Sequence, residues 1–320
     1  MMKRTVELNP VVRERAAKLG DTGTAWISGL PDLIVDLELR WAITIGQPLG
    51  GGTAAYVARA RTADGEDAVV KLAVPDPEFA RQIRTLAAAQ GVGYVRVLAY
   101  DAERHAVLLE ALGPSLDRLG LAPQTQIEAL CDLLPRAWQS ATAAGLAAEV
   151  ALNKADDLAA LVARLWDDLG RPCPKRVTAY ALACAQRRAA AFDPDRCVIV
   201  HGDAAPANAL QVLRPRAGAE AGFVFVDPDG FLGDPSYDLG VVLRDWCPEL
   251  LAGDALTLAR RYCRLLAVQT GMKEAVIWEW GFLERVSTGL YALSLGAEDL
   301  ARPFLSTAEA LLEKESGEGS

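Results

Sequence analysis

The spacing of hydrophobic and polar positions changes along the chain and predicts a different structure for each part. Residues 5–40 have apolar positions at helical intervals, with a turn expected at Gly29-Leu30-Pro31. Short apolar runs separated by glycine and aspartate follow, as is typical of strands, at 42–45, 55–60, 68–72, 94–100 and 106–110. One helix is expected at 78–90, between the third and fourth strands. The sequence therefore predicts a helical extension, residues 1–40, before a small sheet, residues 41–112.

After Gly113 the spacing becomes helical again, and the chain is rich in alanine and leucine. Helices are expected at 124–147, 155–170, 174–191 and within 235–312, with two short strands at 197–200 and 223–226. The last residues, 313–320, are polar and are expected to be disordered. Residues 113–312 thus form a second, mainly helical part, which predicts a chain of two lobes.

The composition is that of a globular protein without a membrane span. The chain has 320 residues, of which 51% are hydrophobic and 23% are charged, enough for a core in each of two lobes. No apolar stretch approaches the roughly 20 residues of a membrane-spanning helix, and the first residues lack the apolar core of a signal peptide. We therefore expect a cytoplasmic protein. Its six cysteines form no C-x-x-C pair, which argues against a zinc ribbon, a dithiol redox site and a disulfide framework.

The net charge of −9 limits the expected partners. Nucleic acids and anionic membrane surfaces both select clustered lysine and arginine, so neither is expected to bind this chain. The charge suits a cationic small molecule, although mild acidity is also ordinary for proteins of this kind.

A glycine-rich segment, Gly50-Gly51-Gly52-Thr53, lies between two expected strands. It nearly fits the pattern G-x-G-x-x-G-x-V, with Ala55 in place of the third glycine. Glycines let backbone amides approach phosphates closely, because no side chain intervenes. A turn without any ligand is the alternative for this segment taken alone. A dinucleotide-binding fingerprint is excluded, because a strand rather than a helix follows.

Lys71 lies within the apolar strand expected at 68–72 and requires a counter-charge or a ligand. In kinases a strand lysine contacts the nucleotide phosphates and pairs with an acid on the next helix. Glu78 is the only acid on the helix expected here, and Gln82 lies one turn further on. A lysine that reaches solvent from an edge strand is the alternative.

His201, Asp203 and Asn208 match the kinase catalytic-loop pattern H-x-D-x-x-x-x-N. An aspartate at the start of such a loop can accept the proton of an attacking hydroxyl, and the asparagine can ligate Mg²⁺. Asp227 ends an apolar strand and supplies a second metal ligand. We expect His201 to orient the loop through hydrogen bonds. A metal-hydrolase site is disfavoured because only one further histidine, His105, is present, and no G-x-S-x-G motif supports a serine hydrolase.

Further acidic residues follow the loop. Asp234 is expected to cap a helix, and Asp238 is expected to hold the catalytic loop by accepting backbone N–H bonds. Glu284 and Arg285 interrupt an apolar helix, which predicts a buried ion pair or a pocket wall. Four carboxylates are candidates, by position only, to face a cationic acceptor: Asp229, Asp245, Glu279 and Glu284.

Taken together, the chain resembles the aminoglycoside phosphotransferase family, in particular its branch of streptomycin 6-phosphotransferases and hydroxyurea or viomycin kinases. The resemblance covers most of the chain and is carried by the following residues and segments: Ala25 to Pro31, Lys71, Gly93 to Leu98, Leu108 to Glu110, His201 to Asp203, Asn208, Val226 to Pro228 and Gly233 to Leu239. It implies an α+β, bilobal protein-kinase-like fold, with a small antiparallel-sheet N-lobe and a larger, mainly helical C-lobe.

The resemblance also implies roles for particular residues. Asp203 would be the catalytic base or hydroxyl-orienting group, and Asn208 and Asp227 would bind magnesium. Lys71 and the glycine-rich segment would bind the phosphates of ATP between the lobes. The adenine would lie against a hinge formed by Glu110, Ala111 and Leu112.

Two departures from the family are visible. The family places a glutamate near Gln82, so either Glu78 substitutes for it or the ion pair with Lys71 is absent. The loop between the two metal ligands, residues 213–222, is longer than a tight hairpin and is expected to bulge at the surface.

We therefore predict an ATP- and Mg²⁺-dependent phosphotransferase that acts on a hydroxyl group of a small molecule. Only six residues separate Asp227 from Asp234, which leaves no room for the activation segment of a protein kinase. A streptomycin-like aminoglycoside leads as the acceptor, followed by hydroxyurea, viomycin or an ordinary metabolite such as an amino alcohol or a sugar. A non-catalytic nucleotide-binding pseudokinase is the alternative from a different class.

Overall fold

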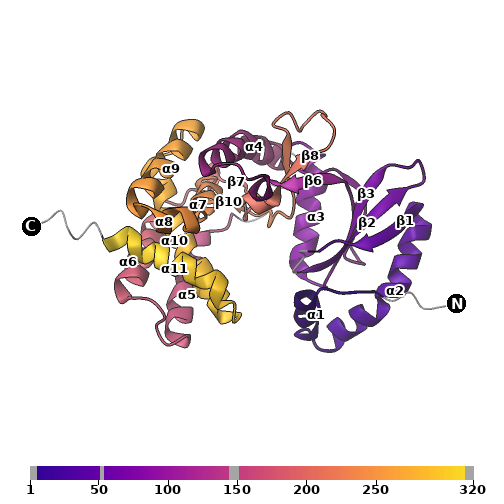
Figure 1. Cartoon of the computed structure of the whole chain (residues 1–320), viewed down its shortest axis with the longest axis horizontal. Coiled ribbons are helices and arrows are strands. Elements are labelled where there is room, and N and C mark those ends of the chain that lie inside the picture. Colours follow the sequence, from indigo (N-terminus) through magenta and orange to yellow (C-terminus); the bar gives the residue numbers. More distant parts are fainter. Residues whose placement is uncertain (1–5, 51–53, 144–150, 314–320) are drawn as a thin grey trace, which may run out of the picture. The chain divides into compact units, whose positions relative to one another are not determined.

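The structure, a computed structural model, describes residues 6–50, 54–143 and 151–313. The chain forms two compact units (Figure 1). The first consists of Met1–Gly113 and Val212–Val224, and the second of Pro114–Gln211 and Phe225–Ser320. A short segment from the second half of the sequence therefore belongs to the first unit.

The first unit is built around a five-stranded antiparallel sheet with the order β1-β2-β3-β5-β4. Its elements are α1 (Pro10–Ala17), α2 (Asp21–Trp41), β1 (Ile43–Pro48), β2 (Ala55–Thr62), β3 (Asp67–Ala73), α3 (Pro77–Ala89), β4 (Val97–Asp101) and β5 (Ala106–Glu110). The predicted strands and the inserted helix are confirmed, and β4 begins three residues later than expected. Alternation places Ala68, Val70 and Leu72 of β3 on the buried face against α2, and Lys71 on the opposite face with α3.

The turn predicted at residues 29–31 is wrong, because α2 continues through Pro31. Proline removes one backbone donor from a helix, but Leu30, Ile34 and Leu37 are all buried against the sheet and hold the helix in place. The sequence predicts a separate helical extension at residues 1–40. The described part of this segment instead shares a hydrophobic core with the sheet.

The loop expected to bulge at the surface, residues 213–222, also belongs to the first unit. The N–H of Gly93 donates to the carbonyl of Gly218 at 2.8 Å, and Arg216 is largely buried, with 8% of its side chain exposed. The loop is exposed over part of its length, as predicted, but it is more than a surface bulge, because Arg216 and Gly218 pack into the first unit.

The second unit is mainly helical, as predicted. Its helices are η1 (Leu116–Leu119), α4 (Pro123–Ala143), α5 (Lys154–Asp168), α6 (Lys175–Ala190), η3 (Pro194–Arg196), η4 (Pro206–Asn208), α7 (Ser236–Arg244), α8 (Cys247–Ala252), α9 (Ala255–Thr270), α10 (Glu274–Ser294) and α11 (Glu298–Glu313). Residues 144–147 of the first predicted helix and 314–320 of the predicted disordered tail lie outside the described residues. The buried helix α10 packs against α5, α6, α7, α9 and α11.

Short strands flank the polar motifs of the second half of the chain. Strand β7 (Val198–Ile199) pairs with β10 (Leu232–Gly233), and β6 (Leu112–Ser115), β8 (Ala209–Val212) and β9 (Phe223–Phe225) form a sheet in the order β6-β8-β9. The loop from His201 to Asn208 therefore runs between β7 and β8, and Asp227 follows β9.

Helices α7 and α10 approach each other at glycines. A Cβ atom at Gly240 would lie 2.3 Å from the Cβ of Trp280, and one at Gly281 would lie 2.8 Å from a methyl of Leu243. Side chains at these two positions would push the helices apart. This close packing places the side chains of α7 beside those of α10.

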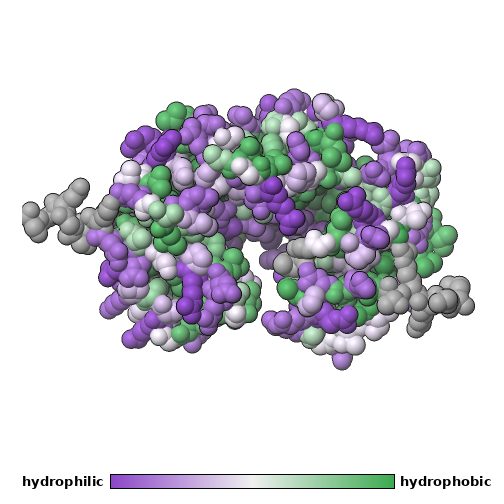
Figure 2. Space-filling view, in the orientation of Figure 1, coloured by the Kyte–Doolittle hydropathy of each residue, from purple (hydrophilic) through white to green (hydrophobic). Residues whose placement is uncertain are grey.

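None of the helices in the described residues is long and apolar enough to cross a bilayer. Figure 2 shows hydrophilic side chains over most of the visible face, mixed with smaller hydrophobic areas. All six cysteines are free, and five of them are buried, as expected for small apolar residues.

Candidate active site

Asp238, in the first turn of α7, holds the catalytic-loop motif in place through hydrogen bonds. Its Oδ2 accepts the backbone N–H of His201 at 2.8 Å and the indole N–H of Trp138 at 2.7 Å. Its Oδ1 accepts the N–H of Gly202 at 2.8 Å. Asp238 is completely buried, so these three donors replace the water it has lost. The predicted loop-holding role of Asp238 is confirmed.

His201 uses both ring nitrogens inside the protein. Its Nε2 donates to the carbonyl of Val226 at 2.9 Å, and its Nδ1 accepts the N–H of Asp203 at 3.1 Å. These two bonds require the neutral tautomer with the proton on Nε2. The ring is fully buried, so it orients the loop and does not face the solvent as a base.

Asp203 is fixed through both carboxylate oxygens. The amide nitrogen of Asn208 donates to Asp203 Oδ2 at 2.9 Å and to the Asp203 carbonyl at 2.8 Å. Arg244 Nη2 donates to Oδ1, while 44% of the Asp203 side chain stays exposed. Burial raises the pKa of Asp203, but the Arg244 charge and these hydrogen bonds outweigh it and hold the pKa below its usual range. The carboxylate is therefore ionised at neutral pH, fixed and accessible.

Arg244, at the end of α7, is a site residue that the sequence analysis missed. Its Nη1 donates to Glu284 Oε2 at 2.8 Å, and Tyr237 OH donates to Glu284 Oε1 at 2.7 Å. Only 14% of the Arg244 side chain and 4% of the Glu284 side chain are exposed. Burial lowers the pKa of Arg244, but the charges of Asp203 and Glu284 raise it further, to well above its usual value. Arg244 is therefore a permanent cation between two carboxylates.

Glu284 forms a buried ion pair, as predicted, but its partner is not Arg285. Glu284 pairs with Arg244, whereas Arg285 donates to the carbonyl of Leu243 at 2.6 Å and contacts Cys247 Sγ at 3.7 Å. Adjacent residues on a helix point in directions about 100° apart, so one helix sends the two charges to different neighbours.

The pKa of Asp245, the residue after Arg244, predicts that the free energy of unfolding depends on pH. Burial raises its pKa to about 6, against the lowering effect of Arg244, which lies 3.7 Å away. Because the folded state holds this proton more tightly than the unfolded chain, the stability contributed by Asp245 is lost as the pH rises from about 4 through 6. Asp245→Asn should therefore unfold with a free energy up to about 3 kcal/mol higher above pH 7, and nearly the same near pH 4.

Urea unfolding of both proteins across this pH range measures the difference. Asp132→Asn, on the exposed side of α4, is the matched control and should leave the pH profile unchanged. A constant offset between Asp245→Asn and the wild type at all pH values would show that Asp245 does not titrate in this range.

The two expected metal ligands are tied to each other through the backbone. The N–H of Val226 donates to the carbonyl of Asn208 at 2.9 Å, and Asp227 follows with a left-handed φ of 56°, which aspartate tolerates better than most residues. The bonds of the Asn208 side chain to other described residues are donated by its nitrogen. An amide oxygen from Asn208 and a carboxylate from Asp227 are together a donor set that fits a hard cation such as Mg²⁺.

The expected phosphate-binding residues belong to the first unit. Lys71 Nζ donates to Gln82 Oε1 at 3.1 Å. Glu78 lies in the first turn of α3, with 70% of its side chain exposed and its carboxylate 3.8 Å from Arg81. Glu78 therefore does not replace the missing helix acid, and one side chain that contacts Lys71 is the neutral amide of Gln82. Gly50 is exposed, and the expected phosphate contacts at Gly51, Gly52 and Thr53 lie outside the described residues.

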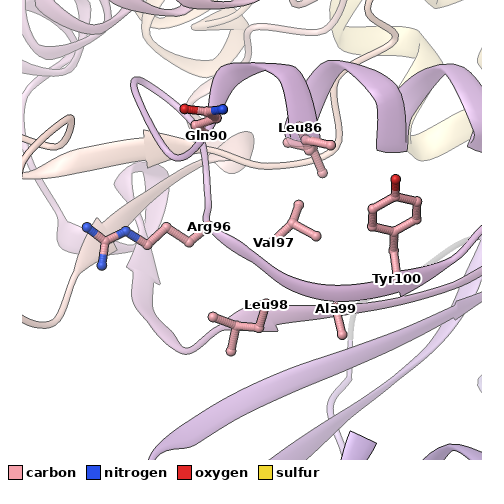
Figure 3. Close-up of a pocket in the computed structure, with 8 residues that line it drawn as sticks. Leu86, Gln90, Arg96, Val97, Leu98, Ala99 and Tyr100 are labelled. Carbon is pink, nitrogen blue, oxygen red and sulfur yellow. The ribbon is translucent and has the colours of Figure 1, made fainter. Parts of the chain in front are cut away.

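The expected hinge follows β5. Glu110 accepts the backbone N–H of Arg96 at 2.8 Å and pairs with Arg216, so its carboxylate is occupied. Ala111 and Leu112 are half-buried. A cavity of about 550 Å³ lies elsewhere in the same unit, between α3 and β4, and Figure 3 shows Leu86 facing Val97 across it. None of the expected site residues lines this cavity.

The carboxylates considered for a cationic acceptor are largely committed to arginines. Glu279 pairs with Arg187 and Arg188, and Glu284 pairs with Arg244. Asp229 lies against Gly202, where an added Cβ would be 2.5 Å from the Asp229 Cβ. Glu279 and Glu284 therefore serve the packing of the helical unit.

Comparisons with known proteins agree with this arrangement. Residues 40–293 match the family described as aminoglycoside/hydroxyurea antibiotic resistance kinase. The chain is 27% identical to a streptomycin 6-kinase of Streptomyces glaucescens, over 94% of this chain and 95% of that protein. It is 31% identical to a hydroxyurea phosphotransferase of Kitasatospora aureofaciens, over 92% of this chain and 82% of that protein.

The fold is shared with a solved structure as well. A thermostable mutant of the aminoglycoside phosphotransferase APH(4)-Ia superposes with a TM-score of 0.60 at 17% identity, over 90% of this chain and 100% of that chain. The predicted α+β, protein-kinase-like fold is confirmed, as is the predicted class of enzyme, a small-molecule phosphotransferase. The chain belongs to the family of aminoglycoside/hydroxyurea antibiotic resistance kinases.

Proposed function

We propose that the protein transfers the γ-phosphoryl group of ATP, with Mg²⁺, to a hydroxyl group of a streptomycin-like aminoglycoside. A hydroxyurea-type compound is the second candidate, because one of the similar proteins is a hydroxyurea phosphotransferase. The observation that carries the proposal is the state of Asp203, which is ionised, accessible and fixed on both oxygens by Asn208 and Arg244. Because the reaction consumes ATP, we place the protein in the cytoplasm.

In this mechanism Asp203 accepts a hydrogen bond from the acceptor hydroxyl. This bond orients the hydroxyl oxygen toward the γ-phosphorus atom. A carboxylate with a lowered pKa is a weak base, so orientation is its main contribution, and it takes up the proton as the new P–O bond forms. His201 keeps the loop in register by bonding to Val226 and to the Asp203 amide. Positioning of this kind can supply a large part of the rate.

Asn208 and Asp227 are the proposed magnesium ligands, through the amide oxygen and the carboxylate. Bound Mg²⁺ would neutralise negative charge on the phosphates. Lys71 is proposed to bind the nucleotide phosphates, held by Gln82. Because Gln82 is neutral, it orients the lysine without adding a negative charge beside the phosphates.

Product analysis by mass spectrometry tests the proposal. The purified protein is incubated with MgATP and, separately, with streptomycin, other aminoglycosides, viomycin, hydroxyurea and common amino alcohols. We expect one compound to gain the mass of a phosphoryl group with the wild type and not with Asp203→Asn. Asp132→Asn serves as a matched control and should behave as the wild type.

The outcomes separate the candidate functions. Phosphorylation of an amino alcohol alone would reject the antibiotic substrate and keep the enzyme class. Tight MgATP binding without any product in the panel would reject the proposed acceptors and favour a metabolite outside the panel or a non-catalytic nucleotide-binding protein.

A further inference from the structure

An arginine in the loop between the two proposed metal ligands is built into the first unit. Arg216 Nε donates to Glu110 Oε2 at 3.0 Å, and its Nη2 donates to Glu110 Oε1 and to the Tyr94 carbonyl, the latter at 3.0 Å. Its Nη1 donates to the Gly91 carbonyl at 2.6 Å. With 8% of its side chain exposed, Arg216 is bound to these four acceptor atoms outside its own loop, and its Nη1 also donates to the Ala217 carbonyl at 3.1 Å.

Glu110, the partner of Arg216, also forms hydrogen bonds through both its carboxylate and its backbone. One carboxylate oxygen also accepts the backbone N–H of Arg96 at 2.8 Å, and the N–H of Glu110 donates to the Arg96 carbonyl at 3.1 Å. Arg96 stands at one end of the cavity in Figure 3. The fork-to-fork pairing of a guanidinium with a carboxylate fixes direction as well as distance. The end of β5 is therefore held in a single orientation by its own side chain.

The loop that carries Arg216 is itself packed against the first unit. The Gly93 N–H donates to the Gly218 carbonyl at 2.8 Å. Gly218 has a left-handed φ of 81°, and an added Cβ would lie 2.9 Å from the Gly91 carbonyl oxygen. The loop thus lies against the turn between α3 and β4, which anchors Arg216 from behind.

We propose that Arg216 is a positioning residue for the base of the nucleotide. This inference rests on the proposed function, in which the main chain of residues 110–112 lies against the adenine. Arg216 acts through Glu110: it fixes the strand end whose backbone groups meet the base, so that they need not be ordered when the nucleotide binds. It does not touch the phosphates, which are assigned to Lys71 and the metal ligands.

A purely structural arginine would affect all ligands alike, so the test compares a nucleotide with its phosphates alone. The affinities for MgADP and for magnesium tripolyphosphate are measured by calorimetry. In Arg216→Met, MgADP binding should weaken by about tenfold, which corresponds to roughly 1.4 kcal/mol. Tripolyphosphate binding should stay within about twofold of the wild type, because only the base has lost its positioned partner.

The same loop offers a matched control. Arg214 pairs with Glu66 at 3.0 Å, but 81% of its side chain is exposed, and exposed pairs contribute little. Arg214→Met should leave both affinities unchanged. Arg216→Lys, which keeps the charge and loses the fork geometry, should give an intermediate loss for MgADP only.

The results distinguish a positioning role of Arg216 from a purely structural one. An equal loss of both ligands, or no loss of either, overturns the positioning role. If Arg216→Met does not fold, Glu110→Gln takes its place, and it should show a smaller loss that is again confined to MgADP. A wild-type protein that binds neither ligand would contradict the proposed function together with this inference, whereas wild-type binding that Arg216→Met retains contradicts the inference alone.

Discussion

Replacing Arg244 by methionine should reduce turnover by at least about a hundredfold and lower the free energy of unfolding by about 3–5 kcal/mol. Arg244 is the cation between Asp203 and Glu284. Without it, the Glu284 carboxylate, at 4% exposure, loses its cation, and Tyr237 is its remaining side-chain partner among the described residues. Asp203 loses the partner of one carboxylate oxygen and can rotate away from the acceptor hydroxyl.

A second substitution separates the two effects. In Arg244→Met with Glu284→Gln, the buried charge is gone and the glutamine can still accept the bond from Tyr237, so most of the lost stability should return. Turnover should remain low, because Asp203 still lacks Arg244. Urea unfolding and single-turnover rates measure both quantities, with Arg264→Met as the control, since the Arg264 side chain is 70% exposed. Recovery of turnover in the double variant would show that Arg244 acts on stability alone.

The parts of the site that the sequence predicts are those set by local spacing. His201, Asp203 and Asn208 lie within one loop, and Asp238 lies in the first turn of the next helix, where a carboxylate can accept backbone N–H groups. Strand alternation likewise places Lys71 on the face of the sheet opposite the buried core. His201, Asp203 and Asn208 are a few positions apart, and Lys71 follows from a periodicity that the sequence displays directly. Asp238 lies 37 residues from His201, but its place at the start of a helix marks it as an acceptor of backbone N–H groups.

The parts that the sequence does not predict are long-range pairs. Arg244 is 41 residues from Asp203, and Arg216 is 106 residues from Glu110. In the sequence each arginine is one of many that could face solvent, and only the fold brings its partner within hydrogen-bond distance. A weak signal exists for Arg244, which ends an apolar helix and faces another apolar helix that contains Glu284. No comparable signal marks Arg216.

Tertiary structure overrides one local prediction and decides one alternative that the sequence left open. Pro31 would end an isolated helix, but the apolar side chains around it are buried against the sheet. Glu78 and Gln82 lie one turn apart on α3, so spacing alone could not choose between them. The position of α3 along β3 decides the matter, because it brings Gln82 to Lys71 and leaves Glu78 at the exposed end.

Asp238→Asn should be nearly as damaging as removal of the side chain, although asparagine has almost the same shape. Both oxygens of Asp238 accept N–H groups, from His201 and Trp138 on one side and from Gly202 on the other. An asparagine must turn its NH₂ group toward one of these donors, which leaves a buried donor unpaired in either orientation. We expect a loss of about 2–4 kcal/mol in the free energy of unfolding and a fall in turnover of at least about tenfold.

Trp138→Phe is the control that tells a single lost bond from a displaced loop. It removes one donor and leaves both backbone bonds of the catalytic loop, so it should cost about 1 kcal/mol and leave turnover near that of the wild type. If Asp238→Asn kept normal turnover, the bonds of His201 to Val226 and Asp203 would suffice to hold the loop. If it lost turnover at unchanged stability, the role of Asp238 would be to set the direction of Asp203 rather than to support the fold.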